Sequence, residues 1–154
     1  MPHKESSFNW QDLTAVTTAI IAVLAAITSL HMSSTASLIL LEKNNSNYFQ
    51  AKANKEWNYY LANDITSRVL KQPDLEVQKN LQREAESLEQ QAEIATKKAS
   101  AHFERNGQLT TAGTFFEIAI ALSAMSVLLK NKPVWVMSLL LSVVGIFFLF
   151  LGVN

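Results

Sequence analysis

The sequence contains no cysteine, only four glycines and three prolines, and no excess of charge of either sign. Without cysteine there is no disulfide, no thiolate zinc site and no cysteine nucleophile. The 13 basic and 13 acidic side chains give a formal net charge of zero and form no basic stripe, which argues against nucleic-acid binding. The glycines form no phosphate-binding loop, and no serine has the sequence context of a nucleophile elbow.

Histidine is also scarce, since the chain holds only His3, His31 and His102, without the spacing of a metal site. We therefore expect no metal and no cofactor. Because no set of residues meets the requirements of a catalytic site, we expect no catalytic residue and no enzymatic activity.

Charged residues are missing from long parts of the 154-residue chain. None occurs over residues 13–41 or 133–154, and only Glu117 interrupts residues 109–129. Residues 42–106, in contrast, hold 20 of the 26 charged side chains. Because the uncharged stretches would dominate the surface of a single soluble globule, this distribution excludes that class of protein.

Three stretches are long and apolar enough to cross a bilayer, which takes about 20 residues. They cover residues 13–32, 109–129 and 134–153. Only residues 130–133 separate the second from the third, so we expect these two helices to be antiparallel, with Pro133 at the first helical position. The sequence predicts an all-α integral membrane protein with three transmembrane helices.

The first apolar stretch also has some features of a cleaved signal peptide, because a small polar run follows it at residues 33–37. Two features oppose cleavage. Lys4 is offset by Glu5 and Asp12, and the stretch is longer than the usual signal. We therefore expect a retained span over residues 13–41, counting its polar extension, after a short tail at 1–12.

The orientation in the membrane is set by basic residues near the membrane ends, which favour the cytoplasm. Six such residues lie on the side of the charged segment, against Lys4, Lys130 and Lys132 on the other side. However, the charged segment is too long for loop charges to decide, and its acids interleave with its bases. We expect the N-terminus and the 130–133 loop in the cytoplasm and the charged segment outside.

The charged segment, residues 42–108, has one proline and no glycine before Gly107, which favours helix. The turn is expected at residues 71–74, around the proline. The result is an extramembrane antiparallel hairpin with arms of about 32 residues, each roughly 48 Å long at 1.5 Å per residue. Residues 44–47 and 106–107 are weak points, which act either as joints or as parts of continuous helices.

Each predicted arm carries a face that we expect to pack against the other. The first arm has an apolar ladder at four-residue spacing, and the second has a heptad seam made mostly of alanine. The ladder consists of Trp57, Leu61, Ile65 and Val69, and the seam of Leu81, Ala85, Leu88, Ala92, Ala95 and Ala99. Two interpretations of Trp57 and Tyr60 stay open: packing within the hairpin, or contact with a ligand or a protein partner.

Glu117 lies eight residues into the second apolar stretch, about 12 Å from its start at 1.5 Å per residue. A carboxylate at such a depth costs on the order of 2.5–3.5 kcal/mol on insertion scales. Two hypotheses stay open: a hydrogen-bonded residue that holds helices together, or part of an ion or proton pathway. The polar residues expected near it are Thr28 and Ser29 of the first span and Thr114 of its own span.

Small residues recur at four-residue spacing along the first span, and Gly113 lies one turn from Glu117. The small residues of the first span include Thr18, Ala22 and Ala26. This face could contact the second span, a neighbouring subunit or water, and we expect packing because small residues let membrane helices approach closely. Together with the intramembrane acid, this face predicts a homo-oligomer.

Several segments together resemble a known family. They read TAVTTAIIAVLAAIT at 14–28, WNYYLA at 57–62, FEIAIALSA at 116–124 and KNKPVW at 130–135, followed by Gly145 and Gly152. Over nearly its whole length the chain is similar to a bacterial three-span membrane family known as domain of unknown function 4337. The resemblance implies a multi-pass protein of the bacterial inner membrane with a helical insertion after the first span, and no known activity.

Two functional hypotheses follow. The first is a non-enzymatic oligomeric scaffold or assembly protein, which lies in the lipid bilayer and meets a protein partner through the hairpin, at Trp57 and Tyr60. The second is a subunit of a small oligomeric ion channel or transporter, which uses Glu117 in the membrane.

Overall fold

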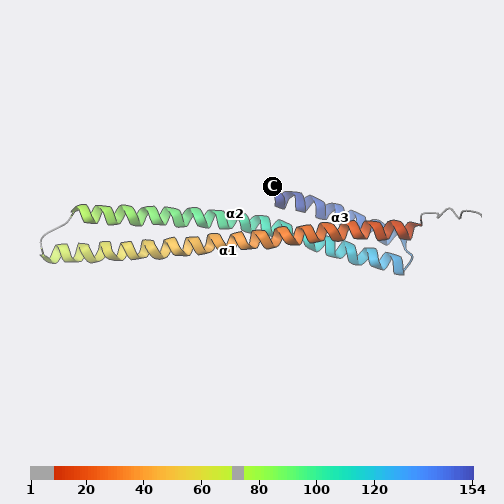
Figure 1. The fold of residues 1–154 in the computed structure, drawn as a ribbon, viewed down its shortest axis with the longest axis horizontal. Coiled ribbons are helices and arrows are strands. Elements are labelled where there is room, and N and C mark those ends of the chain that lie inside the picture. The colour runs from red at the N-terminus through yellow and green to blue at the C-terminus, as the bar shows by residue number, and fades with distance from the viewer. Residues whose placement is uncertain (1–8, 71–74) are drawn as a thin grey trace, which may run out of the picture. The chain divides into compact units, whose positions relative to one another are not determined.

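The computed structural model describes residues 9–70 and 75–154, and these residues form three α-helices (Figure 1). Helix α1 covers Trp10–Leu70, α2 covers Leu75–Leu128 and α3 covers Lys132–Val153. Each helix contains a window long and apolar enough to cross a membrane. The all-α class and the three candidate spans are therefore confirmed. The turn predicted at 71–74 and most of the predicted tail lie outside the described residues.

The helices contribute to two compact units. The first, here called the span unit, contains residues 9–35 and 104–154 and therefore parts of all three helices. The second, here called the charged unit, contains residues 36–70 of α1 and 75–103 of α2. The span unit holds the apolar stretches, and the charged unit holds most of the charged side chains.

The ends of the helices follow local rules. At the start of α1, the Asp12 carboxylate accepts a hydrogen bond of 3.0 Å from the backbone N–H of Asn9, in the first turn where the helix dipole favours an acid. After α2, Lys130 has a φ of 50°, in the left-handed region that ends many helices. Pro133 is the second residue of α3, one position later than predicted, where its missing N–H costs nothing.

Neither of the two weak points interrupts a helix. Residues 44–47 lie within α1 and residues 106–107 lie within α2, so both are parts of continuous helices rather than joints. In the charged unit, Ser46 is buried and its hydroxyl lies 2.8 Å from the hydroxyl of Thr96. Packing of this kind outweighs the low helix propensity of a short polar run.

The core of the span unit is formed by residues from all three helices. Ile21, Ala112, Phe116 and Ala119 are its buried centre, and Leu24, Ala25, Ile120, Leu141, Phe148 and Leu149 pack around them. Two glycines of α3 make the close approach to α2 possible. A Cβ on Gly145 would lie 2.8 Å from the Phe116 ring, and one on Gly152 would lie 2.8 Å from Leu109. The pairing runs in reverse order along the two helices, as predicted for an antiparallel pair.

Replacing Gly145 with alanine is expected to destabilise the purified protein by about 1–3 kcal/mol, because the new methyl group would overlap the fully buried Phe116 ring. The matched control is Gly107→Ala, whose Cβ would meet nothing within 4 Å. There, the loss of glycine flexibility should stabilise α2 by about 0.5–1 kcal/mol. Thermal unfolding in detergent, followed by far-ultraviolet circular dichroism, measures both changes. Shifts of the same sign and size would contradict this packing.

Candidate functional site

The intramembrane acid predicted from the sequence lies on the outside of the span unit. Glu117 is exposed, and no hydrogen bond or ion pair joins it to another residue of the described chain. Thr28, one of its expected partners, is fully buried and donates to the carbonyl of Leu24 at 2.8 Å. Ser29 is exposed on α1. The structure therefore does not bring these hydroxyls to the carboxyl group.

Gly113 and Thr114, which are also near Glu117 in sequence, lie on different sides of α2. Gly113 faces α1, since a Cβ there would lie 3.7 Å from Met32 Sδ and 3.9 Å from Thr28 Cγ2. Thr114 is exposed, and its hydroxyl donates to the carbonyl of Thr110 at 3.0 Å. Of the two residues near Glu117 in sequence, Thr114 thus shares its exposure, whereas Gly113 serves the packing of α1 on α2.

The predicted small-residue face of α1 is only partly in contact with other helices. Thr18 is half-buried, and its hydroxyl forms a hydrogen bond with the hydroxyl of Ser123 on α2. Ala22 and Ala26 are exposed and make no part of the buried core. The buried positions of α1 in the span unit recur every seven residues instead, and they are Thr14, Ile21 and Thr28.

A second polar contact inside the span unit was not predicted from the sequence. The indole N–H of Trp135 on α3 donates to the hydroxyl of Thr17 on α1 at 3.1 Å. With the bond between Thr18 and Ser123, it links α1 to both other helices through side chains. Hydrogen bonds between helices hold membrane bundles together, but a hydroxyl within an apolar run does not reveal its partner.

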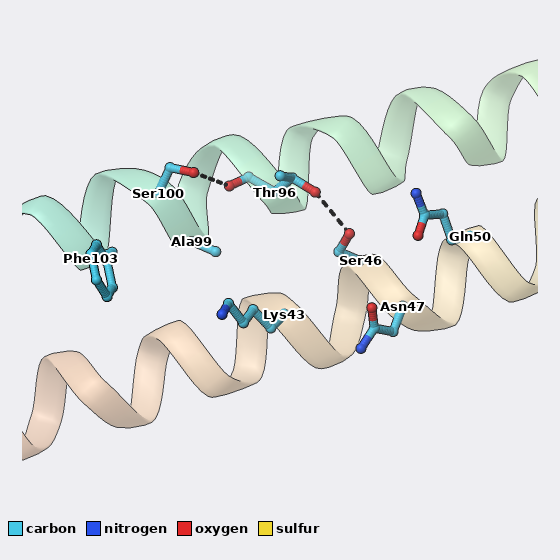
Figure 2. A pocket seen from close by; sticks show the side chains of 8 residues that line it. All are labelled: Lys43, Ser46, Asn47, Gln50, Thr96, Ala99, Ser100 and Phe103. Atoms are coloured by element: carbon cyan, nitrogen blue, oxygen red, sulfur yellow. Dashed lines mark hydrogen bonds between the residues drawn. The ribbon is translucent and has the colours of Figure 1, made fainter.

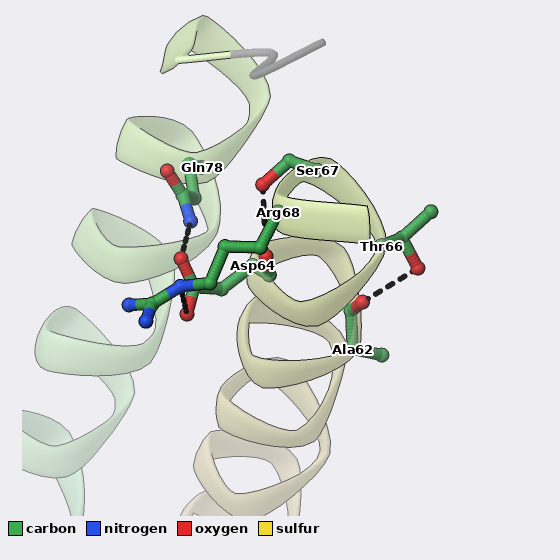
Figure 3. Close-up of polar contacts among 6 residues, drawn as sticks. All are labelled: Ala62, Asp64, Thr66, Ser67, Arg68 and Gln78. Atoms are coloured by element: carbon green, nitrogen blue, oxygen red, sulfur yellow. Dashed lines mark hydrogen bonds and ion pairs between the residues drawn. The ribbon is translucent and has the colours of Figure 1, made fainter. Parts of the chain in front are cut away.

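In the charged unit, three side-chain hydrogen bonds join α1 to α2. They connect Ser46 with Thr96 at 2.8 Å, Trp57 with Glu89 at 2.7 Å, and Asp64 with Gln78 at 2.9 Å, the last drawn in Figure 3. As the residue numbers on α1 increase, those of their partners on α2 decrease, so the two helices are antiparallel in this unit. Asp64 also forms an ion pair of 3.0 Å with Arg68, one turn further along α1 (Figure 3).

The alanine seam predicted for the second arm is confirmed as the packing face of α2. Leu81 is half-buried, and the other five members are buried, namely Ala85, Leu88, Ala92, Ala95 and Ala99. Its spacing of four and three residues is the spacing of a coiled-coil face. Short side chains at most of these positions let the opposing helix come close.

The apolar ladder predicted for the first arm is wrong as a packing face. Leu61, Ile65 and Val69 are 53%, 62% and 75% exposed. The buried positions of α1 in this unit recur at multiples of seven residues, and they are Ile39, Ser46, Ala53 and Ser67. The reason is steric, because a seam of alanines packs closely only on small side chains, whereas large side chains at four-residue spacing would hold the helices apart.

Trp57 and Tyr60 lie at the edge of this packing. Both are half-buried, and their rings meet edge to face with centroids 5.5 Å apart. The indole N–H of Trp57 donates a hydrogen bond to the Glu89 carboxylate. Trp57 also lies one turn before Leu61, so its exposed part continues the line of exposed apolar side chains. From here on, Leu61, Ile65 and Val69 are called the apolar stripe.

The charged unit contains a groove of about 690 Å³ between α1 and α2. Figure 2 shows its lining, which is Lys43, Ser46, Asn47, Gln50, Thr96, Ala99, Ser100 and Phe103. Five of the eight lining residues carry a hydroxyl or amide group, and Lys43 supplies the one charge in this lining. The groove is not visible in the sequence, because its residues come from two segments that only the pairing of α1 with α2 brings together.

The outer surface of the charged unit carries exposed ion pairs. The Lys97 ammonium lies 2.7 Å from the Glu93 carboxylate, and its hydrogen bond and charge lower the pKa of Glu93. Both side chains are exposed, so the pair adds little to stability. In the described parts of the chain, no group of three or more acidic or histidine side chains is arranged to hold a metal ion.

These features define a helical protein with three candidate membrane spans and a charged helical unit. The chain belongs to the family described as domain of unknown function (DUF4337), which matches residues 10–154 and thus all three helices. No curated protein and no solved structure gives a match to the chain.

Replacing Ala53 with leucine is expected to destabilise the protein by about 1–3 kcal/mol, because Ala53 is only 1% exposed and the larger side chain would overpack the seam. The matched control is Ala51→Leu at an exposed position two residues away, where a change within about 0.5 kcal/mol is expected. Thermal unfolding by circular dichroism measures both. An equal loss in the two variants would show that α1 packs on α2 through another face.

Proposed function

We propose that this chain is a non-enzymatic, oligomeric scaffold or assembly protein of the bacterial inner membrane, which binds a protein partner through its charged unit. Residues 13–41, 109–129 and 134–154 cross the membrane. Residues 42–108 form an antiparallel helical hairpin outside it. The apolar windows of the three helices and the family membership support the membrane location.

The observation that carries the proposal is the exposure of the apolar stripe. Leu61, Ile65 and Val69 are more than half exposed in a segment that is otherwise rich in charge. Exposed apolar side chains in a line mark surfaces that bind other proteins. In contrast to the apolar surface of the span unit, this stripe has no lipid to cover it if the hairpin lies in water.

Trp57 and Tyr60 extend this surface. Trp57 continues the stripe by one turn, and Tyr60 lines a shallow groove with Leu75 and Gln78 of α2. Aromatic side chains are enriched among the residues that dominate binding energies. We therefore propose that they contribute to the partner contact with the parts of their rings that packing leaves exposed.

The proposed orientation places the N-terminus and the connection at 130–133 in the cytoplasm and the hairpin outside. Its support is that Lys130 and Lys132 are both exposed in a connection too short to hide charge. A short loop follows the positive-inside rule more reliably than a long one.

The partner contact is tested with Ile65→Lys in the full-length protein. Burying an isoleucine side chain contributes about 1.5–3 kcal/mol, so the charged variant should bind the partner about 10- to 100-fold more weakly. A photo-crosslinking residue at Val69, in membranes of the native host, identifies the partner and measures its capture. The matched control is Thr66→Lys, at an exposed position whose hydroxyl bonds only to the carbonyl of Ala62 (Figure 3). Equal capture by both variants would refute the stripe as the contact surface.

A second function is supported by the polar residues exposed on α2 of the span unit. Thr110, Thr114 and Glu117 lie on one exposed side of the helix, in the arrangement expected of residues that line an ion or proton pathway at the centre of an oligomer. In this alternative the chain is a subunit of a small channel or transporter.

The alternative predicts that purified protein in liposomes passes ions and that Glu117→Gln changes the conductance or its ion preference. Replacing the carboxyl group with an amide changes the polar lining of a narrow apolar pathway and therefore its barrier to ions. The control is Glu104→Gln, at an exposed position of α2 outside the predicted span. Conductance that is absent, or unchanged by Glu117→Gln, would exclude this role.

A further inference from the structure

One exposed side of α2 in the span unit combines small residues with the intramembrane acid. The members of this surface, here called the Glu117 stripe, are all exposed and follow one another at four- and three-residue steps: Thr110, Thr114, Glu117, Ala121 and Ala124. Such steps keep residues on one side of a helix and match the seam of a left-handed helix pair.

The Glu117 stripe faces away from the chain's own helices. The buried residues of α2 in this unit lie on another side and contact α1 and α3, as Phe116 does with Gly145 and Ser123 with Thr18. Both neighbouring helices are thus already packed on α2 without covering the stripe. Among the described residues of this chain, none satisfies the Glu117 carboxyl, which leaves it open to a group from a neighbouring molecule.

Lipid tails do not supply such a group. A carboxyl group in the hydrocarbon region is unfavourable unless it is hydrogen-bonded, paired or hydrated. The alanines at 121 and 124 point to a helix as the neighbour, because small side chains allow the close approach at which hydrogen bonds between helices form. An apolar lipid chain would gain nothing from their small size.

We propose that the Glu117 stripe is the interface with a second copy of this chain, in which α2 packs against α2 about a two-fold axis parallel to the helices. A two-fold axis that relates copies inserted in the same direction must run parallel to the helices, and it places each residue of the stripe opposite its equivalent. The inference rests on the membrane placement of α2 in the proposed function, and it names the partner in the proposed oligomer.

A second copy fits the chemistry of this surface. Two Glu117 carboxyl groups that face each other across the two-fold axis can hydrogen-bond to one another without any further group. The Thr114 hydroxyl donates to the Thr110 carbonyl and keeps its oxygen free to accept a hydrogen bond from across the interface. The surface therefore complements itself, which is what an interface between identical subunits requires.

The absence of native cysteine makes the test direct, because each single-cysteine variant carries one reactive thiol. The reporters are Ala121→Cys and Ala124→Cys in the full-length protein, oxidised in liposomes at increasing lipid dilution. The controls are Ile20→Cys on α1 and Leu140→Cys on α3, which are 55% and 57% exposed. The contacts of Thr18 with Ser123 and of Phe116 with Gly145 place both controls at the level of Ala121.

We expect disulfide-linked dimers from both reporters, persisting on dilution, with at least tenfold less from either control. Adding Glu117→Leu to Ala121→Cys should lower the dimer yield at least tenfold, whereas Glu117→Gln, which keeps a donor and an acceptor, should retain most of it. Equal crosslinking at all four positions, dimers that disappear on dilution, or no effect of Glu117→Leu would overturn the proposal.

The same variants separate this inference from the proposed function. If Glu117→Leu removes the dimer but capture at Val69 still depends on Ile65, the interface is supported and the partner contact does not require it. If the reporters crosslink no better than the controls while capture at Val69 persists, the interface is refuted and the scaffold function stands. If the reporters crosslink and capture at Val69 fails, the scaffold function alone is refuted.

Discussion

The close approach of helices across small side chains is the constraint on which the rest of this structure depends. In the charged unit, the alanines of α2 admit only a face of α1 that is itself mostly small, centred on Ser46, Ala53 and Ser67. In the span unit, Gly145 leaves the space that the Phe116 ring occupies. Once these contacts are made, the larger apolar side chains are left at the surface, where lipid or other proteins can cover them.

Several polar side chains in the span unit form hydrogen bonds between helices, but Glu117 does not. Hydroxyls and one indole N–H join α1 to α2 and α3 inside the span unit, so these groups do not require water. Glu117 has no such partner among residues 9–70 and 75–154, so the three helices of one copy leave its carboxyl group without a hydrogen bond. In the proposed pairing of two copies through α2, the Glu117 carboxyl of one copy finds its partner in the same residue of the other copy.

The two units have different kinds of surface and therefore suit different binding partners. The span unit has apolar surface suited to lipid and one polar stripe suited to another copy, whereas the charged unit has one apolar stripe in a charged surface. Binding through the first would assemble copies of the chain, and binding through the second would recruit a different protein. A scaffold needs both kinds of contact, and neither requires a catalytic residue.

The sequence by itself determined the helical class, the three apolar spans, the exposed loop lysines and the alanine seam of α2, because periodicity and long uncharged runs are local properties of the chain. It did not determine which side of α1 packs in the charged unit, since the large apolar ladder of Leu61, Ile65 and Val69 outweighs a seam of small serine and alanine side chains in any hydrophobicity pattern. It also predicts Gly113 and Glu117 on the same face because they lie one turn apart, but Gly113 faces α1 and Glu117 is exposed. Only the tertiary structure decided that α1 packs through small side chains in the charged unit, that Glu117 faces outward and that Trp135 contacts Thr17, because these facts depend on which surfaces fit closely together.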